Sequence, residues 1–209
     1  MIISRQVLSG LLVLLVIGAL SVYKFCIVKA PGHVKIDIHQ QGRIRGEPSA
    51  PVKIVEYTDF ECPACAAANG LLKDLFIRYE GRICLEHKHF PLPRHAHATR
   101  ASIFAECAAD QGKFWPLEDA LFKSQKSWAE MFSVDAYFTE LAVSLGLDGV
   151  RLTACVNSVD AERRVKKDLE EGKTLDVNST PTFFVNGKRV VGGTFMAQEV
   201  EKILGPAGK

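Results

Sequence analysis

Hydrophobic and polar positions divide the chain into an apolar segment, a short linker and a long region of mixed pattern. Residues 7–23 carry no charge and follow Arg5, and they match the length of a short membrane span. No polar face interrupts them, which argues against a helix of a globular core. Cleavage after Ala19 would place bulky Ile17 where signal peptidase prefers a small residue. We therefore expect residues 1–25 to form a transmembrane anchor, with a cleaved signal peptide as the alternative.

The next segment, residues 26–45, contains proline and glycine breakers and is expected to be a linker. Within it Val34, Ile36 and Ile38 alternate with charged residues, which indicates one short edge strand. The folded domain is then expected to span residues 46–209.

Two kinds of periodicity alternate within this domain. The pattern predicts strand, helix, strand, a helical region, two strands and a helix, at 52–57, 66–79, 82–90, about 95–172, 183–185, 189–191 and 197–204. Asn186-Gly187 separates the last two strands and is typical of a tight hairpin turn. The domain is therefore expected to have an α/β fold.

Two cysteines, Cys62 and Cys65, stand between the first predicted strand and the first predicted helix. The N-terminus of a helix has partial positive charge and unpaired N–H groups, which lower the pKa of a thiol there. Cys62 is then expected to be the exposed attacking thiol, and Cys65 the covered thiol that resolves a mixed disulfide. The spacing alone fits redox chemistry, half of a zinc site or a structural disulfide.

A proline stands where a later apolar strand begins, at Pro181. Proline cannot donate a hydrogen bond to a neighbouring strand, so it is unusual in a central strand. A cis peptide between Thr180 and Pro181 accounts for it, because that bond turns the chain just as the strand starts.

Four stretches occur in order and resemble the DsbA-like thiol-disulfide oxidoreductases of the thioredoxin superfamily: EYTDFECPAC (56–65), HFPL (89–92), CAADQGKFWPLEDALF (107–122) and TPTFFVNG (180–187). The resemblance extends from about Gly46 to Leu204. It implies a thioredoxin fold with a mixed central sheet. The helical region at about 95–172 would then be an insertion that caps the sheet.

The resemblance assigns roles to residues around the cysteines. Glu56 matches an acid of the family, and a buried carboxyl there can pass a proton to or from Cys65. The alternative is a partly exposed residue in a salt bridge. Pro63 and Ala64 match the dipeptide that tunes the reduction potential and, in our interpretation, meets the substrate.

The same resemblance places Pro181 beside the thiols, where it disfavours metal capture by the two sulfurs. Thr180 would present its backbone to an extended substrate segment, in the manner of an added strand. Catalytic residues are therefore expected at Cys62, Cys65, Glu56 and Pro181. Substrate contacts are expected at Pro63, Ala64 and Thr180.

Three of the remaining cysteines are assigned to structure, and Cys26, which follows the apolar segment, is assigned no role. Cys107 and Cys155 lie on separate predicted helices and are expected to pair as a structural disulfide. The alternative is two small buried apolar residues. Cys84, on a predicted strand, is expected to be an inert core thiol.

Four histidines close together raise the question of a metal site: His87, His89, His95 and His97. No carboxylate or cysteine stands at a convincing ligand spacing from them. We therefore expect histidines of a surface or groove, and no bound metal.

Charge and cysteine content restrict partners and location. The 26 basic and 24 acidic residues give a net charge of +2 without a basic block, so nucleic acid is not an expected partner. Lysines after the apolar segment do not favour export of the domain by the positive-inside rule. Six cysteines that include a CxxC pair nevertheless fit an oxidising compartment. We expect a membrane-anchored protein whose domain lies outside the cytoplasm, on the periplasmic or cell-surface side.

The predicted function is a cofactor-free thiol-disulfide oxidoreductase, working as a disulfide-forming oxidase. It would exchange the Cys62–Cys65 disulfide with reduced or unfolded exported proteins, and a membrane-bound redox partner would recycle it. A monomer is expected. The alternatives are a disulfide reductase or isomerase of the same fold, and a metallochaperone that binds through the CxxC cysteines.

Overall fold

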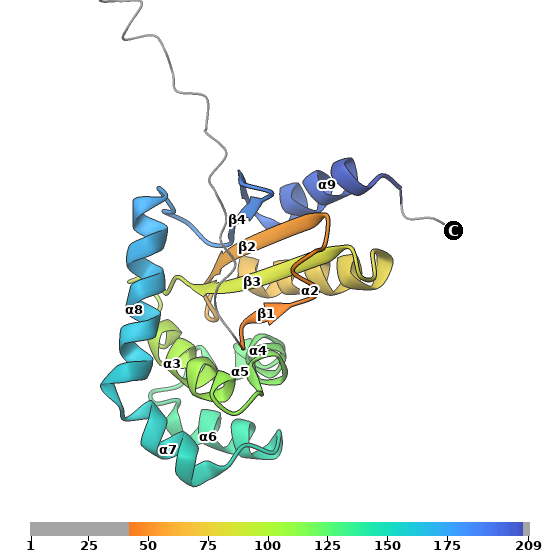
Figure 1. Ribbon diagram of the computed structural model, residues 1–209. Coiled ribbons are helices and arrows are strands. Elements are labelled where there is room, and N and C mark those ends of the chain that lie inside the picture. The colour runs from red at the N-terminus through yellow and green to blue at the C-terminus, as the bar shows by residue number, and fades with distance from the viewer. Residues whose placement is uncertain (1–41, 207–209) are drawn as a thin grey trace, which may run out of the picture. The chain divides into compact units, whose positions relative to one another are not determined.

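The computed structural model describes residues 42–206 of the 209-residue chain (Figure 1). The predicted transmembrane helix and the predicted edge strand at 34–38 lie outside the described residues. Within residues 42–206, none of the helices has the length and apolar character needed to cross a membrane.

Five strands form one mixed sheet in the order β1-β3-β2-β4-β5 (Figure 1). Strands β2 and β3 run parallel, whereas the other neighbouring pairs are antiparallel. Their bounds are β1 Ile44–Arg45, β2 Val52–Thr58, β3 Ile83–His89, β4 Thr182–Val185 and β5 Lys188–Val191. The four strands predicted within the domain are thus confirmed. Strand β1 lies in the segment predicted as linker, so the folded unit begins before residue 46.

The helices follow the predicted order, and their bounds are α2 Pro63–Arg78, α3 Ala98–Ala109, α4 Phe114–Lys123, α5 Gln125–Trp128, α6 Asp135–Ser144, α7 Gly149–Val156, α8 Val159–Thr174 and α9 Gly193–Leu204. Helix α2 starts three residues before the predicted position of 66. Proline is well suited to the first position of a helix, because the N–H that it lacks would have no partner there.

Helices cover both faces of the sheet. On one face, Leu75 of α2 and Val200 of α9 pack with Phe183 of β4. On the other face, Leu169 of α8 packs with Tyr57 of β2. Each strand of the centre therefore has hydrophobic contacts above and below, as a largely buried sheet requires.

Helices α3 to α8 form the predicted insertion between β3 and β4 (Figure 1). Cys107 of α3 and Cys155 of α7 are joined in a disulfide, with Cα atoms 5.7 Å apart. The hydrophobic core of the insertion also includes Cys62 and Cys65. The insertion thus packs directly against the predicted redox pair.

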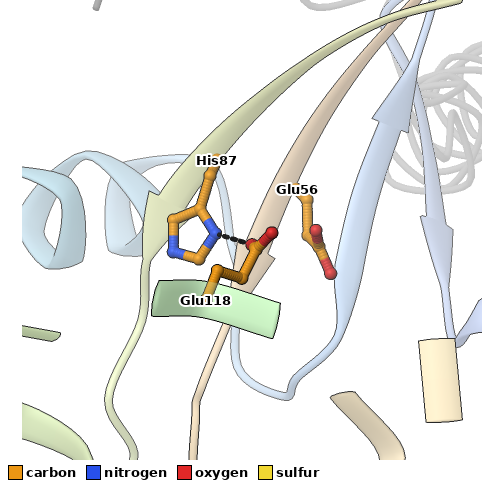
Figure 2. Close-up of side chains that lie close together, drawn as sticks. All are labelled: Glu56, His87 and Glu118. Atoms are coloured by element: carbon orange, nitrogen blue, oxygen red, sulfur yellow. Dashed lines mark hydrogen bonds and ion pairs between the residues drawn. The ribbon is translucent and has the colours of Figure 1, made fainter. Parts of the chain in front are cut away.

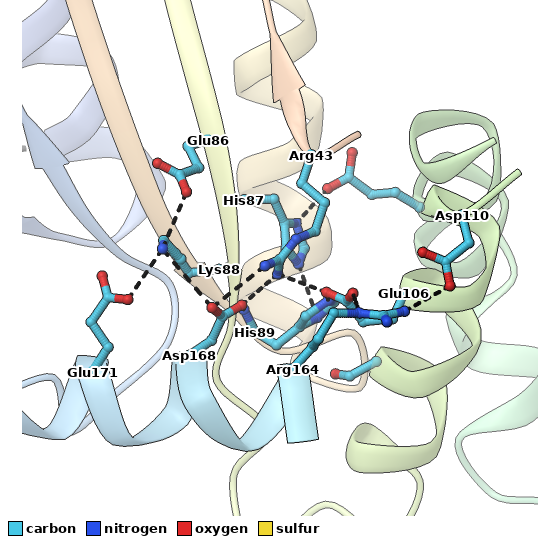
Figure 3. A network of polar contacts seen from close by, with 12 residues as sticks. Arg43, Glu86, His87, Lys88, His89, Glu106, Asp110, Arg164, Asp168 and Glu171 are labelled. Carbon is cyan, nitrogen blue, oxygen red and sulfur yellow. Dashed lines mark hydrogen bonds and ion pairs between the residues drawn. The ribbon is translucent and has the colours of Figure 1, made fainter. Parts of the chain in front are cut away.

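Arg43 ties the start of the folded unit to this insertion (Figure 3). Its side chain is 1% exposed and contacts Asp168 of α8 and Glu106 of α3, the latter at 2.9 Å. Its carbonyl oxygen accepts a hydrogen bond of 3.0 Å from the N–H of His87 on β3. One residue therefore joins β3 to two helices of the insertion through buried polar contacts.

Arg43→Ala is expected to lower the free energy of unfolding by about 3–5 kcal/mol, because it removes the cation between buried carboxylates. Arg163→Ala is the matched control, since Arg163 is exposed and pairs with Asp160 on the same helix. That control is expected to change stability by less than about 0.5 kcal/mol. Urea denaturation measures both variants, and equal losses would show that the Arg43 contacts do not hold the fold together.

Candidate active site

Cys62 precedes helix α2, and Pro63 takes the first helical position. The carbonyl oxygen of Cys62 accepts hydrogen bonds from the N–H groups of Cys65 at 3.0 Å and Ala66 at 3.2 Å. This first turn keeps the two cysteines together. Both carry free thiols, so the structure represents the reduced pair.

The pKa of Cys62 is lowered to about 5, mainly because the Cys65 thiol donates a hydrogen bond to its sulfur. Burial opposes this shift, whereas Thr180 and the backbone N–H groups of Cys65 and Ala64 support it. The start of the helix thus contributes, as predicted, but the neighbouring thiol contributes more. At neutral pH Cys62 is therefore a thiolate, which is the reactive form of cysteine.

The expectation of an exposed Cys62 is not met, because the residue is only 5% exposed. Cys62 belongs to the same hydrophobic cluster as the core of the insertion, and this packing covers most of its surface. Cys65 is fully buried, and burial together with the Cys62 sulfur raises its pKa well above the ordinary value. At neutral pH Cys62 is therefore a charged thiolate, and Cys65 is a protonated thiol.

The Thr180–Pro181 peptide is cis, as the sequence indicates. The carbonyl oxygen of Thr180 accepts a hydrogen bond of 3.5 Å from the Cys62 thiol when that thiol is protonated. Pro63 and Ala64 are exposed at the start of α2. The residues predicted to meet substrate thus gather around Cys62.

Glu56 is 2% exposed on β2, so the alternative of a partly exposed salt-bridging residue is wrong. Burial raises its pKa to about 8, and the nearby Thr58 hydroxyl limits the shift. Thr58 also lowers the pKa of Cys65. Thr58 therefore lies near both Glu56 and the resolving thiol, a placement that the sequence did not indicate.

His87 and His89 are fully buried rather than part of a surface or groove, which corrects our expectation. His87 Nδ1 lies 2.8 Å from Glu118 of α4, and His89 Nε2 lies 3.0 Å from Glu106 of α3. The two carboxyls stand 31 and 17 positions further along the chain. Spacing in the sequence could not reveal these pairs, because the fold of the insertion brings them to β3.

Two groups of three buried side chains each bring ligand atoms within 4.8 Å of one another: Glu56, His87 and Glu118, and His89, Glu106 and Asp168. In the second group the Arg43 guanidinium already supplies positive charge. In the first, His87 bonds directly to Glu118 (Figure 2). Both are therefore interpreted as hydrogen-bonded clusters.

Among residues 42–206, His95, His97 and the third free cysteine, Cys84, belong to neither cluster. His95 bonds to Asp59 at 2.8 Å, and His97 bonds to the carbonyl oxygen of Met131 at 2.7 Å. Cys84 is buried, and burial raises its pKa, as an inert core thiol requires.

A family model described as thioredoxin matches residues 39–204. The chain therefore belongs to this family, and the match includes both cysteines, the cis proline and the whole insertion.

Solved structures with the same fold include DsbA proteins and BdbD. α-DsbA1 of Wolbachia pipientis aligns with a TM-score of 0.67 at 19% identity, over 77% of this chain and 89% of that one. Oxidised BdbD of Bacillus subtilis aligns with a TM-score of 0.68 at 21% identity, over 78% and 92%. DsbA2 of Pseudomonas aeruginosa aligns with a TM-score of 0.65 at 22% identity, over 80% and 97%. The predicted thioredoxin fold of the DsbA-like type is thus confirmed.

Curated proteins with similar sequence include Na⁺/H⁺ antiporters. NhaA 1 of Mycobacterium sp. strain KMS is 37% identical over 155 residues, which are 72% of this chain and 24% of the antiporter. NhaA of Herminiimonas arsenicoxydans is 36% identical over 161 residues, which are 77% and 25%. The chain spans about a quarter of the length of these relatives, so their transport activity is not transferred to it.

Alkylation of the reduced protein tests the division between the two thiols. Cys62 is expected to react with iodoacetamide at a rate that rises with pH around a midpoint near 5, because its thiolate forms there. The rate is measured by mass spectrometry of the alkylated peptides. A midpoint near the 8.5 of an ordinary cysteine would refute the assignment.

Proposed function

We propose that this chain is a thiol-disulfide oxidoreductase that donates the Cys62–Cys65 disulfide to cysteine pairs of exported proteins. The observation that carries this proposal is the unequal pair: Cys62 with a pKa of about 5 beside a buried Cys65 whose pKa is raised. The thioredoxin family membership and the DsbA-like fold support it.

In the proposed reaction a client thiolate attacks the Cys62 sulfur of the oxidised protein. The Cys62–Cys65 bond breaks, a client–Cys62 disulfide forms, and the electron pair stays on Cys65. A second client thiolate then attacks the client sulfur, forms the client disulfide and releases Cys62 as a thiolate. A thiol of low pKa is a good leaving group, so the pKa of Cys62 favours this second step.

Cys65 needs a proton when its bond to Cys62 breaks, because burial disfavours its thiolate. Glu56 is protonated at neutral pH, since its pKa is about 8. It can therefore act as the acid, through or beside the Thr58 hydroxyl, and as the base when the pair is reoxidised. Pro181 and Thr180 complete the proposed site, where the Thr180 backbone pairs with an extended client segment next to Pro63 and Ala64.

The charge on the Cys62 thiolate also determines the direction of net thiol-disulfide exchange. A stabilised Cys62 thiolate favours the reduced protein, and therefore makes its disulfide oxidising. This supports oxidation of clients over the reductase or isomerase alternatives. A metallochaperone is the second candidate, and metal content measured against a dithiol titration of the same sample separates it from the redox function.

Refolding of a reduced multi-cysteine protein with stoichiometric oxidised chain tests the proposal. We expect net formation of client disulfides and a reduction potential well above the roughly −270 mV of thioredoxin. Cys65→Ser is expected to trap mixed disulfides through Cys62, because nothing resolves them, whereas Cys62→Ser traps none. A potential near that of thioredoxin, without net oxidation, would favour a reductase instead.

We further propose that the apolar segment anchors the chain in a membrane, that the domain works as a monomer outside the cytoplasm, and that a membrane-bound partner reoxidises it. The Cys107–Cys155 disulfide supports an oxidising location. The full chain is then expected to stay with membranes after a carbonate wash and to retain an N-terminus at or near Met1. A soluble form that starts near Leu20 would instead show a cleaved signal peptide.

A further inference from the structure

Three buried side chains from different elements lie close together, and one of them is Glu56 of the proposed site (Figure 2). Glu56 comes from β2, His87 from β3 and Glu118 from α4, with one polar atom of each within 4.8 Å of the others. The carboxyl of Glu118 lies between the His87 ring and the Glu56 carboxyl (Figure 2). A side chain of the insertion therefore stands next to the acid of the redox site.

Protonation in this cluster follows from burial. Burial lowers the pKa of His87 well below its ordinary value, so its ring is neutral. Burial and the neighbouring Glu56 raise the pKa of Glu118 well above the ordinary value, so this carboxyl keeps its proton at neutral pH. The contact of 2.8 Å is therefore assigned as the Glu118 O–H donating to His87 Nδ1.

With both rings neutral, the hydrogen bonds from His87 to His89 and on to Glu106 run in the same direction (Figure 3). With Nδ1 accepting, the proton of His87 is on Nε2, which donates to His89 Nδ1 at 3.2 Å. His89 Nε2–H then donates to Glu106 at 3.0 Å. Burial opposes ionisation of Glu106, but His89, Arg43 and Arg164 lower its pKa to about 2. The Glu106 carboxylate thus orients the His89 ring, and through it the His87 ring.

Charged groups of neighbouring elements also act on this cluster. Asp119 on α4 raises the pKa of Glu118 further, and Arg45 on β1 and Lys73 on α2 only partly oppose it. His89 and Arg43 both lower the pKa of His87. Glu118 therefore enters the reaction as a hydrogen-bond donor.

Glu56 offers the matching acceptor. Its Oε1 atom is buried and has no hydrogen-bond partner among the described residues. When Glu56 has given its proton to Cys65, a carboxylate remains in a buried site, which is costly unless a donor reaches it. The neighbouring Glu118 has such a proton.

We propose that Glu118 is a positioning residue of the redox step: its O–H turns from His87 to the Glu56 carboxylate and stabilises it. This inference rests on the proposed thiol-disulfide exchange. As the Cys62–Cys65 bond breaks, the electron pair stays on Cys65 and the Glu56 proton moves to it. Glu56 and Glu118 then share one proton, as neighbouring carboxyls do elsewhere. His87 holds Glu118 in place before the step.

The pKa of Glu56 in the reduced protein is the direct readout, followed by ¹³C NMR of its carboxyl carbon over a pH titration. Glu118→Leu removes the donor, so we expect the pKa of Glu56 to rise by about one unit, a tenfold change in its proton affinity. Glu118→Gln keeps an N–H donor and should shift it clearly less. Glu140→Leu, on the exposed side of α6, is the control and should leave it unchanged.

The second-order rate of glutathione attack on the oxidised protein is measured in parallel. We expect Glu118→Leu to slow it by about tenfold, which corresponds to the same pKa change. Glu118→Gln should restore most of the rate, and this rescue distinguishes donation from packing. Melting temperatures of the oxidised variants check that each protein is folded.

Three other results would contradict either the role of Glu118 or the proposed function. A fall in the pKa of Glu56 in Glu118→Gln would show that Glu118 is an anion that repels it, and would overturn the inference. An unchanged pKa in both variants would do the same. Wild-type protein without any Cys62-dependent exchange would overturn the proposed function instead, while the titration would still report on the two carboxyls.

Discussion

Ionisable side chains are buried between the sheet and the insertion, and the rest of this structure depends on how their charges are accommodated there. A buried charge is tolerated only with a partner, and a buried group without one stays neutral. Paired charges and neutral buried groups both occur next to β3. Near β1, Arg43 neutralises carboxylates of α3 and α8. Near the cysteines, Glu56, His87 and Glu118 are kept neutral instead.

The buried polar groups thus form two halves, one around Arg43 and one around Glu56, and the two halves have different roles. The half around Arg43 is a network of buried ion pairs between the Arg43 guanidinium and the carboxylates of Glu106 and Asp168. The half around Glu56 holds protons that can move, because two carboxyls with raised pKa lie beside a neutral imidazole. His87 and His89 bond to each other and join the halves. The fixed charges thereby orient the side chains whose protons are available for chemistry.

Local patterns in the sequence were sufficient for much of this description. The order of strands and helices, the cis Pro181 and the CxxC pair at a helix start depend on neighbouring residues, which a pattern records. The role of Arg43 and the burial of His87 and His89 depend on partners from distant helices. Cys62 is covered for the same reason, since the insertion that packs over it follows it by many residues.

The unequal thiols also determine how the reduction potential responds to pH. An ordinary dithiol takes up two protons when its disulfide is reduced, so its potential falls by about 59 mV for each pH unit. Here Cys62 remains a thiolate above a pH of about 5, while Cys65 takes a proton. Only one proton then accompanies two electrons, and the potential falls by about 30 mV for each pH unit. The oxidising strength of this protein is therefore buffered against the acidity of its surroundings.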